Sequence, residues 1–388
     1  MKVIHPHIFE ETVSNWPGKY VIGLTGNIAT GKSVVRRMLE HLGAYSIDAD
    51  VLAHRAIAKG APGYAPVLEA FGKFILDPQG EIDRAKLGRI VFSDPEALAQ
   101  LEKIVHPLVE KAIDVMIRRA TQRVIVIEAI KLLEGKLANA CDTIWVTYAS
   151  EATQKARLMQ KRGMSEAEAL QRIHAQPDQQ IKIAAANVVI QNNGSFEDTW
   201  KQVVAAWKTI SPITDTMPAT KTVQTGEFSV QRGRPRDSAN IAAFITRLSG
   251  GAQPMTESDI MAAFGEKAFL LLFAGTQLVG LAGWQVENLV ARTTDLYIAP
   301  SVPAPQALKA LLSEVERASQ ELQCEASLVF IPPKMAGQEA LWKELGYVQR
   351  TPASLGIQAW QEAALESQPP NTILLFKQLR QDRVLRPI

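Results

Sequence analysis

Cysteine is scarce in this chain of 388 residues, which contains only Cys141 and Cys324. Two cysteines exclude a disulfide framework and a cysteine-built zinc site, so we expect a reduced, cytosolic protein. An excess of one charge is also lacking, because 42 basic residues stand against 40 acidic ones. The net charge of +2 argues against a strongly basic nucleic-acid binder and against an acidic solvating chain.

Long apolar runs are missing as well. Apolar stretches such as 124–130 and 268–273 have the length of strands, whereas a membrane span needs about 18 consecutive apolar residues. The first residues lack a basic flank followed by an apolar stretch, so we expect neither a signal peptide nor a membrane partner. Hydrophobic residues still make up 47% of the chain, which is enough to form a core. The sequence leaves the oligomeric state open.

The first half of the chain alternates strand and helix patterns. Buried strands are predicted at 20–25, 44–48, 124–128, 143–148 and 188–190, and helices from about 32 to 42 and at 96–120, 151–162 and 165–175. Strands that alternate with helices are typical of an α/β fold with a parallel sheet covered on both faces.

A stretch rich in threonine and proline, 209–227, shows no apolar period and is predicted to be a linker. It divides the chain into domains 1–208 and 228–388. The second domain is predicted to be α+β. Its expected strands cover 228–233, 268–288 with a turn at Gly275, 293–300, 326–332, a segment containing Tyr347, and 372–379, and its expected helices 237–248, 256–265, 305–322 and 338–346.

Residues 26–33 fit the pattern G-x-x-x-x-G-K-[ST] between a strand and a helix. The pattern comprises Gly26, Asn27, Ile28, Ala29, Thr30, Gly31, Lys32 and Ser33, followed by Val34. Such a loop aims successive N–H groups at a phosphate, and the helix dipole adds to them. Lys32 should reach the β- and γ-phosphates of a nucleotide, and the Ser33 hydroxyl should bind Mg²⁺. The alternative is a glycine-rich turn that only joins strand to helix.

Acidic residues end two of the predicted strands. Glu128 ends strand 124–128 and is either a metal-positioning group or an ordinary strand-end carboxylate. Asp48 and Asp50 end strand 44–48 and would point to one side of an extended chain, near the γ-phosphate. One of these aspartates can accept a hydroxyl proton while the other binds metal-bound water or orients the acceptor. Alternatively, both are solvated turn aspartates. The chain has no N-K-x-D segment of the kind a GTPase needs.

GLTGNIATGKS followed by SIDAD resembles dephospho-CoA kinase, and the resemblance covers about 19–208. Further similar segments follow in the same order at 59–64, 80–109, 154–176 and 186–194. The resemblance implies a P-loop kinase with helical acceptor and lid regions, and transfer of phosphate from ATP, with Mg²⁺, to the ribose 3′-hydroxyl of dephospho-CoA. Another small P-loop kinase acting on a nucleoside or nucleotide is an alternative. A CoA-sensing module with a slow nucleotide switch is a second one.

The resemblance also implies roles for single residues. Asp50 would be the catalytic base, supported by Asp48. The other implied residues are His54, Arg84 and His106 at the acceptor, Arg157, Lys161 and Arg162 in a cationic lid, and Arg172 and Gln176 on one helix facing ATP. Without the resemblance, the lid cations are a solvated basic face and His106 is a capping or packing residue before a proline turn.

Two departures from the family pattern leave roles open. Segment 128–134 lacks the usual proline and contains an extra Lys131. The lid reads Gln160-Lys161-Arg162-Gly163, so which of its cations is catalytic stays ambiguous.

The order of elements in the second half resembles a GNAT-type acyltransferase domain, including the turn Leu345-Gly346-Tyr347. The pyrophosphate loop of that family is lacking, because the corresponding segment 299–306 has no glycine and each of its prolines lacks an N–H donor. A matching string at 247–252 lies at the end of a helix, in the wrong element. We therefore favour a binding or interaction module over an active acyltransferase. Arg232, Arg234 and Arg236 could bind an anion, but a solvated loop is the simpler interpretation.

Overall fold

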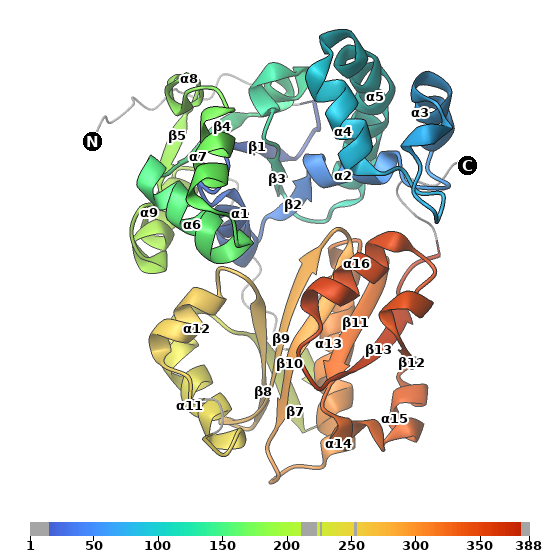
Figure 1. Ribbon diagram of the computed structural model, residues 1–388. Coiled ribbons are helices and arrows are strands. Elements are labelled where there is room, and N and C mark those ends of the chain that lie inside the picture. The colour runs from blue at the N-terminus through green and yellow to red at the C-terminus, as the bar shows by residue number, and fades with distance from the viewer. Residues whose placement is uncertain (1–14, 211–222, 226, 252–253, 382–388) are drawn as a thin grey trace. The chain divides into compact units, whose positions relative to one another are not determined.

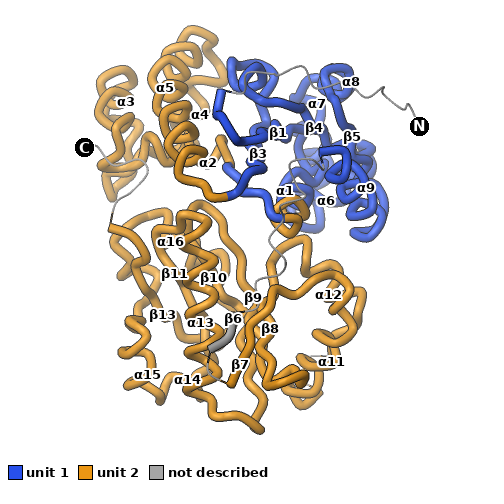
Figure 2. Tube along the Cα trace, turned by 180° about the vertical axis from the view of Figure 1, so that it is seen from behind, with its two compact units in different colours: residues 1–36, 43–47, 122–215 blue, residues 37–42, 48–121, 216–388 orange. Residues whose placement is uncertain are grey.

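The computed structural model describes residues 15–210, 223–225, 227–251 and 254–381 (Figure 1). The chain divides into two compact units. Unit 1 comprises residues 1–36, 43–47 and 122–215, and unit 2 comprises 37–42, 48–121 and 216–388 (Figure 2). Among the described residues, no helix is long and apolar enough to cross a bilayer.

Unit 1 contains a five-stranded sheet with the order β2-β3-β1-β4-β5. Its strands are β1 (Tyr20–Thr25), β2 (Tyr45–Asp48), β3 (Val124–Glu128), β4 (Thr143–Tyr148) and β5 (Val188–Gln191). β1 pairs in parallel with β3 and β4, and β4 pairs in parallel with β5. The predicted parallel sheet is confirmed. Every residue of β3 is buried, as expected for an apolar strand covered on both faces.

The helices of unit 1 follow its strands. They are the first half of α1 (Lys32–His41), α6 (Glu151–Arg162), α7 (Glu166–His174), α8 (Gln179–Ala184) and α9 (Phe196–Lys208), with short 3₁₀ turns at Leu132–Glu134 and Lys136–Ala140. Ser165 and Ser195 begin α7 and α9 with capping boxes. β1 lies between β3 and β4, where the strand order reverses. In open parallel sheets, ligands bind beyond the carboxyl end of a strand at this point.

Unit 2 contains four helices of the first half of the sequence, which we call the helical region (49–119). They are α2 (Ala49–Ala56), α3 (Tyr64–Phe71), α4 (Arg84–Ser93) and α5 (Pro95–Arg119). Asp83 and Asp94 cap α4 and α5 by accepting hydrogen bonds from first-turn amides. α2, α3 and α4 all pack against α5. Of these four helices, the sequence pattern predicted only α5.

The rest of unit 2 is an eight-stranded sheet with helices, which we call the C-terminal sheet region (223–378). Its strands are β6 (Val223–Thr225), β7 (Phe228–Arg232), β8 (Ala268–Ala274), β9 (Gln277–Glu287), β10 (Val290–Ile298), β11 (Ala326–Ile331), β12 (Val348–Arg350) and β13 (Ile373–Gln378). The order is β12-β13-β11-β10-β9-β8-β7-β6. Among the described strands of this sheet, β10 and β11 pair in parallel and the other neighbours pair antiparallel.

Six helices connect these strands. They are α11 (Ser238–Leu248), α12 (Glu257–Ala263), α13 (Ala304–Glu321), α14 (Pro333–Ala336), α15 (Glu339–Glu344) and α16 (Gln358–Ser367), with 3₁₀ turns at Lys73–Ile75 in the helical region and at Pro235–Asp237 and Pro352–Ser354 here. α13 packs on β7, β8, β9 and β10. α16 places Trp360, Ala363 and Ala364 in one core cluster with alternate residues of β11 such as Leu328 and Phe330.

The linker, the segment around Tyr347 and one helix differ from the predictions or lie partly outside the described residues. Residues 211–222 and 226 of the predicted linker lie outside the described residues, and 223–225 form the edge strand β6. Tyr347 precedes β12 instead of lying in a strand, and its ring is buried. Helix α16 was not predicted, because its apolar residues show only a weak helical period.

Within unit 2, the helical region and the end of α1 contact the C-terminal sheet region. Arg37 Nη1 donates to the Val286 carbonyl at 3.0 Å, and Gln323 Nε2 donates to the Met116 carbonyl at 2.9 Å. His41 Nε2 lies 2.8 Å from the Phe264 carbonyl. These bonds join residues more than 200 positions apart, so the two regions share one compact unit.

Candidate active site

The loop between β1 and α1 adopts backbone angles that need glycine at two positions. Gly31 has φ +94, and a Cβ there would lie 1.9 Å from Asn192 Nδ2. Gly26 has φ +155, and a Cβ there would lie 2.3 Å from Thr147 Oγ1. The loop thus passes closely beside the end of β4 and the residue that follows β5. Sequence reasoning predicted the loop and its glycines but not these two neighbours.

Asn192 and Arg157 hold the outer side of this loop. Asn192 Nδ2 donates to the Thr30 carbonyl at 2.9 Å, and Arg157 Nη1 donates to the Ala29 carbonyl at 3.1 Å. Arg157 Nη2 also donates to the Asn192 carbonyl at 2.8 Å, and Thr199 Oγ1 donates to Asn192 Oδ1 at 2.9 Å. These bonds fix the main chain of the loop at Ala29 and Thr30. Asn192 follows β5, a strand-end position that could have marked it in the sequence.

Lys32 and Ser33 lie at the start of α1, where the first N–H groups have no acceptor within the helix. The Lys32 ammonium is buried and donates to the carbonyls of Gly26 and Asn27 at 3.1 and 3.3 Å. It curls over the loop at the place where phosphate oxygens would replace these carbonyls. Main-chain amides, a lysine and a hydroxyl thus converge at one point, which suits a nucleotide polyphosphate.

Glu128 is part of a buried ion pair. Its Oε2 lies 2.7 Å from Arg36 Nε, and both side chains are 6% exposed. Its Oε1 accepts a long hydrogen bond of 3.4 Å from Ser33 Oγ. Glu128 thus ends β3 in an ion pair with Arg36 and lies beside the hydroxyl predicted to bind Mg²⁺. No cluster of three or more histidine, cysteine or acidic groups among the described residues could hold a metal ion by itself.

Gln176 touches the loop from a different element than expected. Its Oε1 accepts from the Ile28 amide at 2.6 Å, and Asn27 Nδ2 donates to the Pro177 carbonyl at 2.8 Å. The placement of Arg172 and Gln176 on one helix is wrong, because α7 ends at His174. Arg172 is exposed on that helix, whereas Gln176 lies beyond its end.

Arg157, one of the three predicted lid cations, contacts the loop. It is partly buried, and desolvation lowers its pKa from the usual guanidinium value without removing its charge at neutral pH. Lys161 and Arg162 form the exposed end of α6, which stops at Gly163 in a left-handed conformation. The burial of Arg157 singles it out from its neighbours.

The two aspartates after β2 lie in different elements. Asp48 ends β2 and caps α2, where its Oδ1 accepts from the Val51 amide at 3.0 Å. Asp50 lies in the first turn of α2. The prediction that both point to one side of an extended chain is therefore wrong, because the chain turns into a helix at Ala49. Asp48 has a structural role as a cap, which leaves Asp50 as the candidate base.

The predicted acceptor residues belong to the helical region of unit 2, together with Asp50. His54 lies four residues after Asp50 on α2, and Arg84 begins α4. Desolvation, and to a smaller degree the charge of Arg84, lower the pKa of His54. His106 is exposed inside α5 and is followed by Pro107 within the same helix. The alternative interpretation of a proline turn after His106 is wrong, because α5 runs through Pro107.

Comparison with known proteins identifies the first half of the chain. A family model described as dephospho-CoA kinase matches residues 20–198. A dephospho-CoA kinase from Geobacter metallireducens is 45% identical over 191 residues, which cover 48% of this chain and 95% of the relative. The chain belongs to the dephospho-CoA kinase family. The phosphate loop, β1–β5 and the helical region all fall within the matched residues.

Two groups of solved structures are similar to the chain. A dephospho-CoA kinase from Campylobacter jejuni is 28% identical, covers 50% of this chain and 98% of its own, and has a TM-score of 0.38. An N-acetyltransferase from Thermoplasma acidophilum is 11% identical, covers 39% of this chain and 98% of its own, and has a TM-score of 0.30.

The segment where a GNAT-type pyrophosphate loop was sought joins β10 to α13. Pro303 precedes α13 without a side-chain cap, and a second proline follows in the first turn. The matching string that begins at Arg247 lies at the end of α11, as predicted.

Proposed function

We propose that this member of the dephospho-CoA kinase family transfers the γ-phosphoryl group of ATP to the ribose 3′-hydroxyl of dephospho-CoA, giving ADP and CoA. One observation carries the proposal. The buried Lys32 ammonium and the start of α1 converge on a loop that Asn192 and Arg157 hold from behind. Such a preorganised site lowers the barrier of phosphoryl transfer mainly by positioning and electrostatics.

Three side chains are assigned to the chemistry. Lys32 exchanges its two loop carbonyls for oxygens of the β- and γ-phosphates. Asp50 accepts the proton of the attacking hydroxyl. Arg157 stands beside the loop as a fixed positive charge against the charge that builds up on the transferred group.

Mg²⁺ fits the donors beside the loop. The Ser33 hydroxyl and the Glu128 carboxylate lie 3.4 Å apart and offer the hard oxygen ligands that this ion prefers. Arg36 already neutralises Glu128, so Ser33 would bind the ion and Glu128 would orient the hydroxyl. When bound, the ion would neutralise charge on the phosphates.

The test is mass spectrometry of dephospho-CoA incubated with ATP, Mg²⁺ and the full chain. The expected product is CoA. Parallel reactions with AMP, uridine and shikimate should give no phosphorylated acceptor. Lys32→Ala should abolish turnover. A preference for another acceptor would replace the proposed substrate. Tight ATP binding without turnover on any acceptor would instead favour a binding module.

A matched pair of aspartate variants tests the base. Asp50→Asn should lower kcat by about 10²–10⁴-fold while ATP still binds. Asp48→Asn removes the same charge two residues away and keeps a good helix cap, so it should lower kcat far less. If Asp50→Asn keeps nearly normal kcat, or if both variants lose activity equally, the assignment of the base is wrong.

A further inference from the structure

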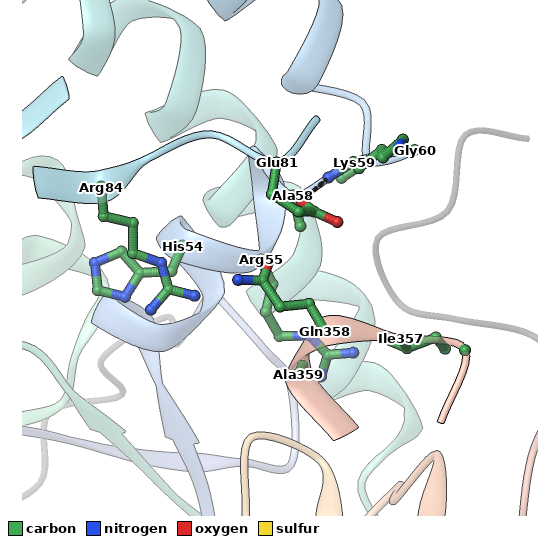
Figure 3. Close-up of a pocket in the computed structure, with 12 residues that line it drawn as sticks. His54, Arg55, Ala58, Lys59, Gly60, Glu81, Arg84, Ile357, Gln358 and Ala359 are labelled. Atoms are coloured by element: carbon green, nitrogen blue, oxygen red, sulfur yellow. Dashed lines mark hydrogen bonds between the residues drawn. The ribbon is translucent and has the colours of Figure 1, made fainter. Parts of the chain in front are cut away.

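Unit 2 contains a cavity between the helical region and the C-terminal sheet region. Its volume is about 160 Å³, and its walls come from α2 and the loop after it, from Glu81 and Arg84, and from residues 356–359 (Figure 3). Pockets for drug-sized ligands usually measure about 300–1,000 Å³. This cavity therefore fits a group the size of a diphosphate instead of a whole nucleotide.

The charge of the cavity suits an anion. Arg55, Lys59 and Arg84 line it with His54 and the carboxylate of Glu81. Outside the lining, Glu325 pairs with Arg55, and Glu362 of α16 pairs with Arg84. The cations of Lys59 and Arg84 are held only by weak contacts. Lys59 Nζ donates to an exposed main-chain carbonyl at 3.0 Å, and the 52% exposed Arg84 makes one 3.4 Å surface ion pair. An exposed ion pair of this kind contributes about 0–1 kcal/mol, so an entering anion can displace it.

Arg55 joins the helical region to the C-terminal sheet region at one side of the cavity. Its Nη2 lies 2.5 Å from Glu325 Oε2, and its Nη1 donates to the Asn288 carbonyl at 2.8 Å. The side chains of Arg55 and Glu325 are 11% and 1% exposed. Because a broken buried ion pair is costly, this pair holds α2 against the C-terminal sheet region and keeps the cavity closed on that side.

The C-terminal sheet region contributes the start of α16 to the cavity. Ile357 precedes this ten-residue helix in an extended conformation, without a side-chain cap. The amides of Trp360 and Gln361 already bond to the Ile357 carbonyl, both at 3.0 Å. The earlier amides, of Gln358 and Ala359, have no acceptor within the helix and belong to residues that line the cavity. These amides complement the cations across the cavity.

The helix that lines the cavity, α2, also carries the proposed base. Asp50 and His54 are four residues apart on α2, so their side chains share one helix face. The rise between them is about 6 Å. In dephospho-CoA one ribose carries both the 3′-hydroxyl and the 5′-diphosphate. A ribose whose hydroxyl meets Asp50 can therefore extend its diphosphate along α2 to His54 and Arg84.

On this basis, and resting on the proposed function, we propose that the cavity binds the diphosphate of dephospho-CoA. Arg84, Lys59 and His54 bind it from the helical region, and the first amides of α16 bind it from the opposite wall. The C-terminal sheet region is thereby part of the acceptor site. Its role is substrate recognition, separate from any acyl transfer.

The decisive experiment adds one charge to the wall of α16 in the full chain. Ala359→Glu places a carboxylate on the cavity wall, and a carboxylate in a first helical turn does not harm folding. We expect the KM for dephospho-CoA to rise by at least about tenfold, with the KM for ATP unchanged. Ala359→Gln has the same size without the charge, so its effect should be about tenfold smaller.

A second carboxylate on α16 controls for charge alone. Leu365 is 71% exposed and lies six residues beyond Ala359, about 9 Å along the helix. Leu365→Glu should leave both KM values unchanged. If Ala359→Glu and Leu365→Glu behave alike, or if Ala359→Glu raises the KM for ATP as well, the cavity does not bind the acceptor.

A main-chain test and a binding test complete the design. Gln358→Pro removes one amide at a position where proline suits a helix, and Ile357 already has the extended backbone that precedes proline. The KM for dephospho-CoA should rise more in Gln358→Pro than in Gln358→Ala. Calorimetry with inorganic pyrophosphate, with saturating ADP filling the phosphate loop, tests the cavity without turnover. Wild type should bind it and Ala359→Glu should not, even if the chain phosphorylates another acceptor. Equal binding by both overturns the cavity, whereas binding without CoA formation overturns only the proposed function.

Discussion

Replacing Gly31 by alanine separates backbone strain from steric contact in the phosphate loop. Alanine at a positive φ costs about 1–2 kcal/mol. The new Cβ would also displace the Asn192 amide, which lies 1.9 Å away and bonds to Thr30 and Thr199. Two lost hydrogen bonds add about 1–3 kcal/mol. We therefore expect Gly31→Ala to lower the free energy of unfolding of the loop region by about 2–5 kcal/mol.

Gly163 provides the control for this variant. It also has a positive φ, +62, but no atom lies within 4 Å of a Cβ built there. Gly163→Ala should therefore cost only the strain of about 1–2 kcal/mol. Calorimetric titration with ATP and urea unfolding followed by fluorescence measure both variants. ATP should bind Gly163→Ala normally and Gly31→Ala at least about tenfold more weakly, since 1.4 kcal/mol is tenfold. Equal ATP affinity of the two variants would refute the argument that Asn192 positions the loop.

Three further predictions follow from buried groups. Glu128→Gln should lower the free energy of unfolding by about 3–5 kcal/mol, because the buried Arg36 loses the charge of its ion-pair partner. The double variant Arg36→Met with Glu128→Leu should recover most of that loss in urea unfolding. Equal stability of the single and double variants would contradict this. Burial lowers the pKa of His41 from 6.5 to about 3. Between these two pH values, His41 binds a proton in the unfolded chain but not in the folded chain. The free energy of unfolding should then fall by up to about 1.4 kcal/mol per pH unit as the pH drops below 6.5. It should fall less steeply in His41→Gln. Identical pH slopes of wild type and His41→Gln would contradict this prediction. Burial also raises the pKa of Cys141 to about 12 and raises that of Cys324 further. Neither thiol should therefore react with Ellman's reagent at pH 8 until urea unfolds the chain. Rapid labelling of the native protein would disprove this prediction.

Local patterns were sufficient for much of unit 1. The strand before the phosphate loop, the glycines at 26 and 31, and the lysine and serine that follow are dictated by short-range chemistry, since phosphate binding needs close backbone approach and a helix start. The apolar runs of β1, β3 and β4 likewise predicted a parallel sheet, because strands covered on both faces have no polar alternation.

Only the tertiary structure decided which groups meet. No pattern in the sequence pairs Asn192 with Thr30, or Arg55 with Glu325 across 270 residues, because such contacts depend on how elements pack. Arg157 differs from Arg162 only in burial, which a linear pattern of cations does not reveal. Helix α16 shows the same limit, since its ten residues take their stability from packing on β11 rather than from a strong amphipathic period.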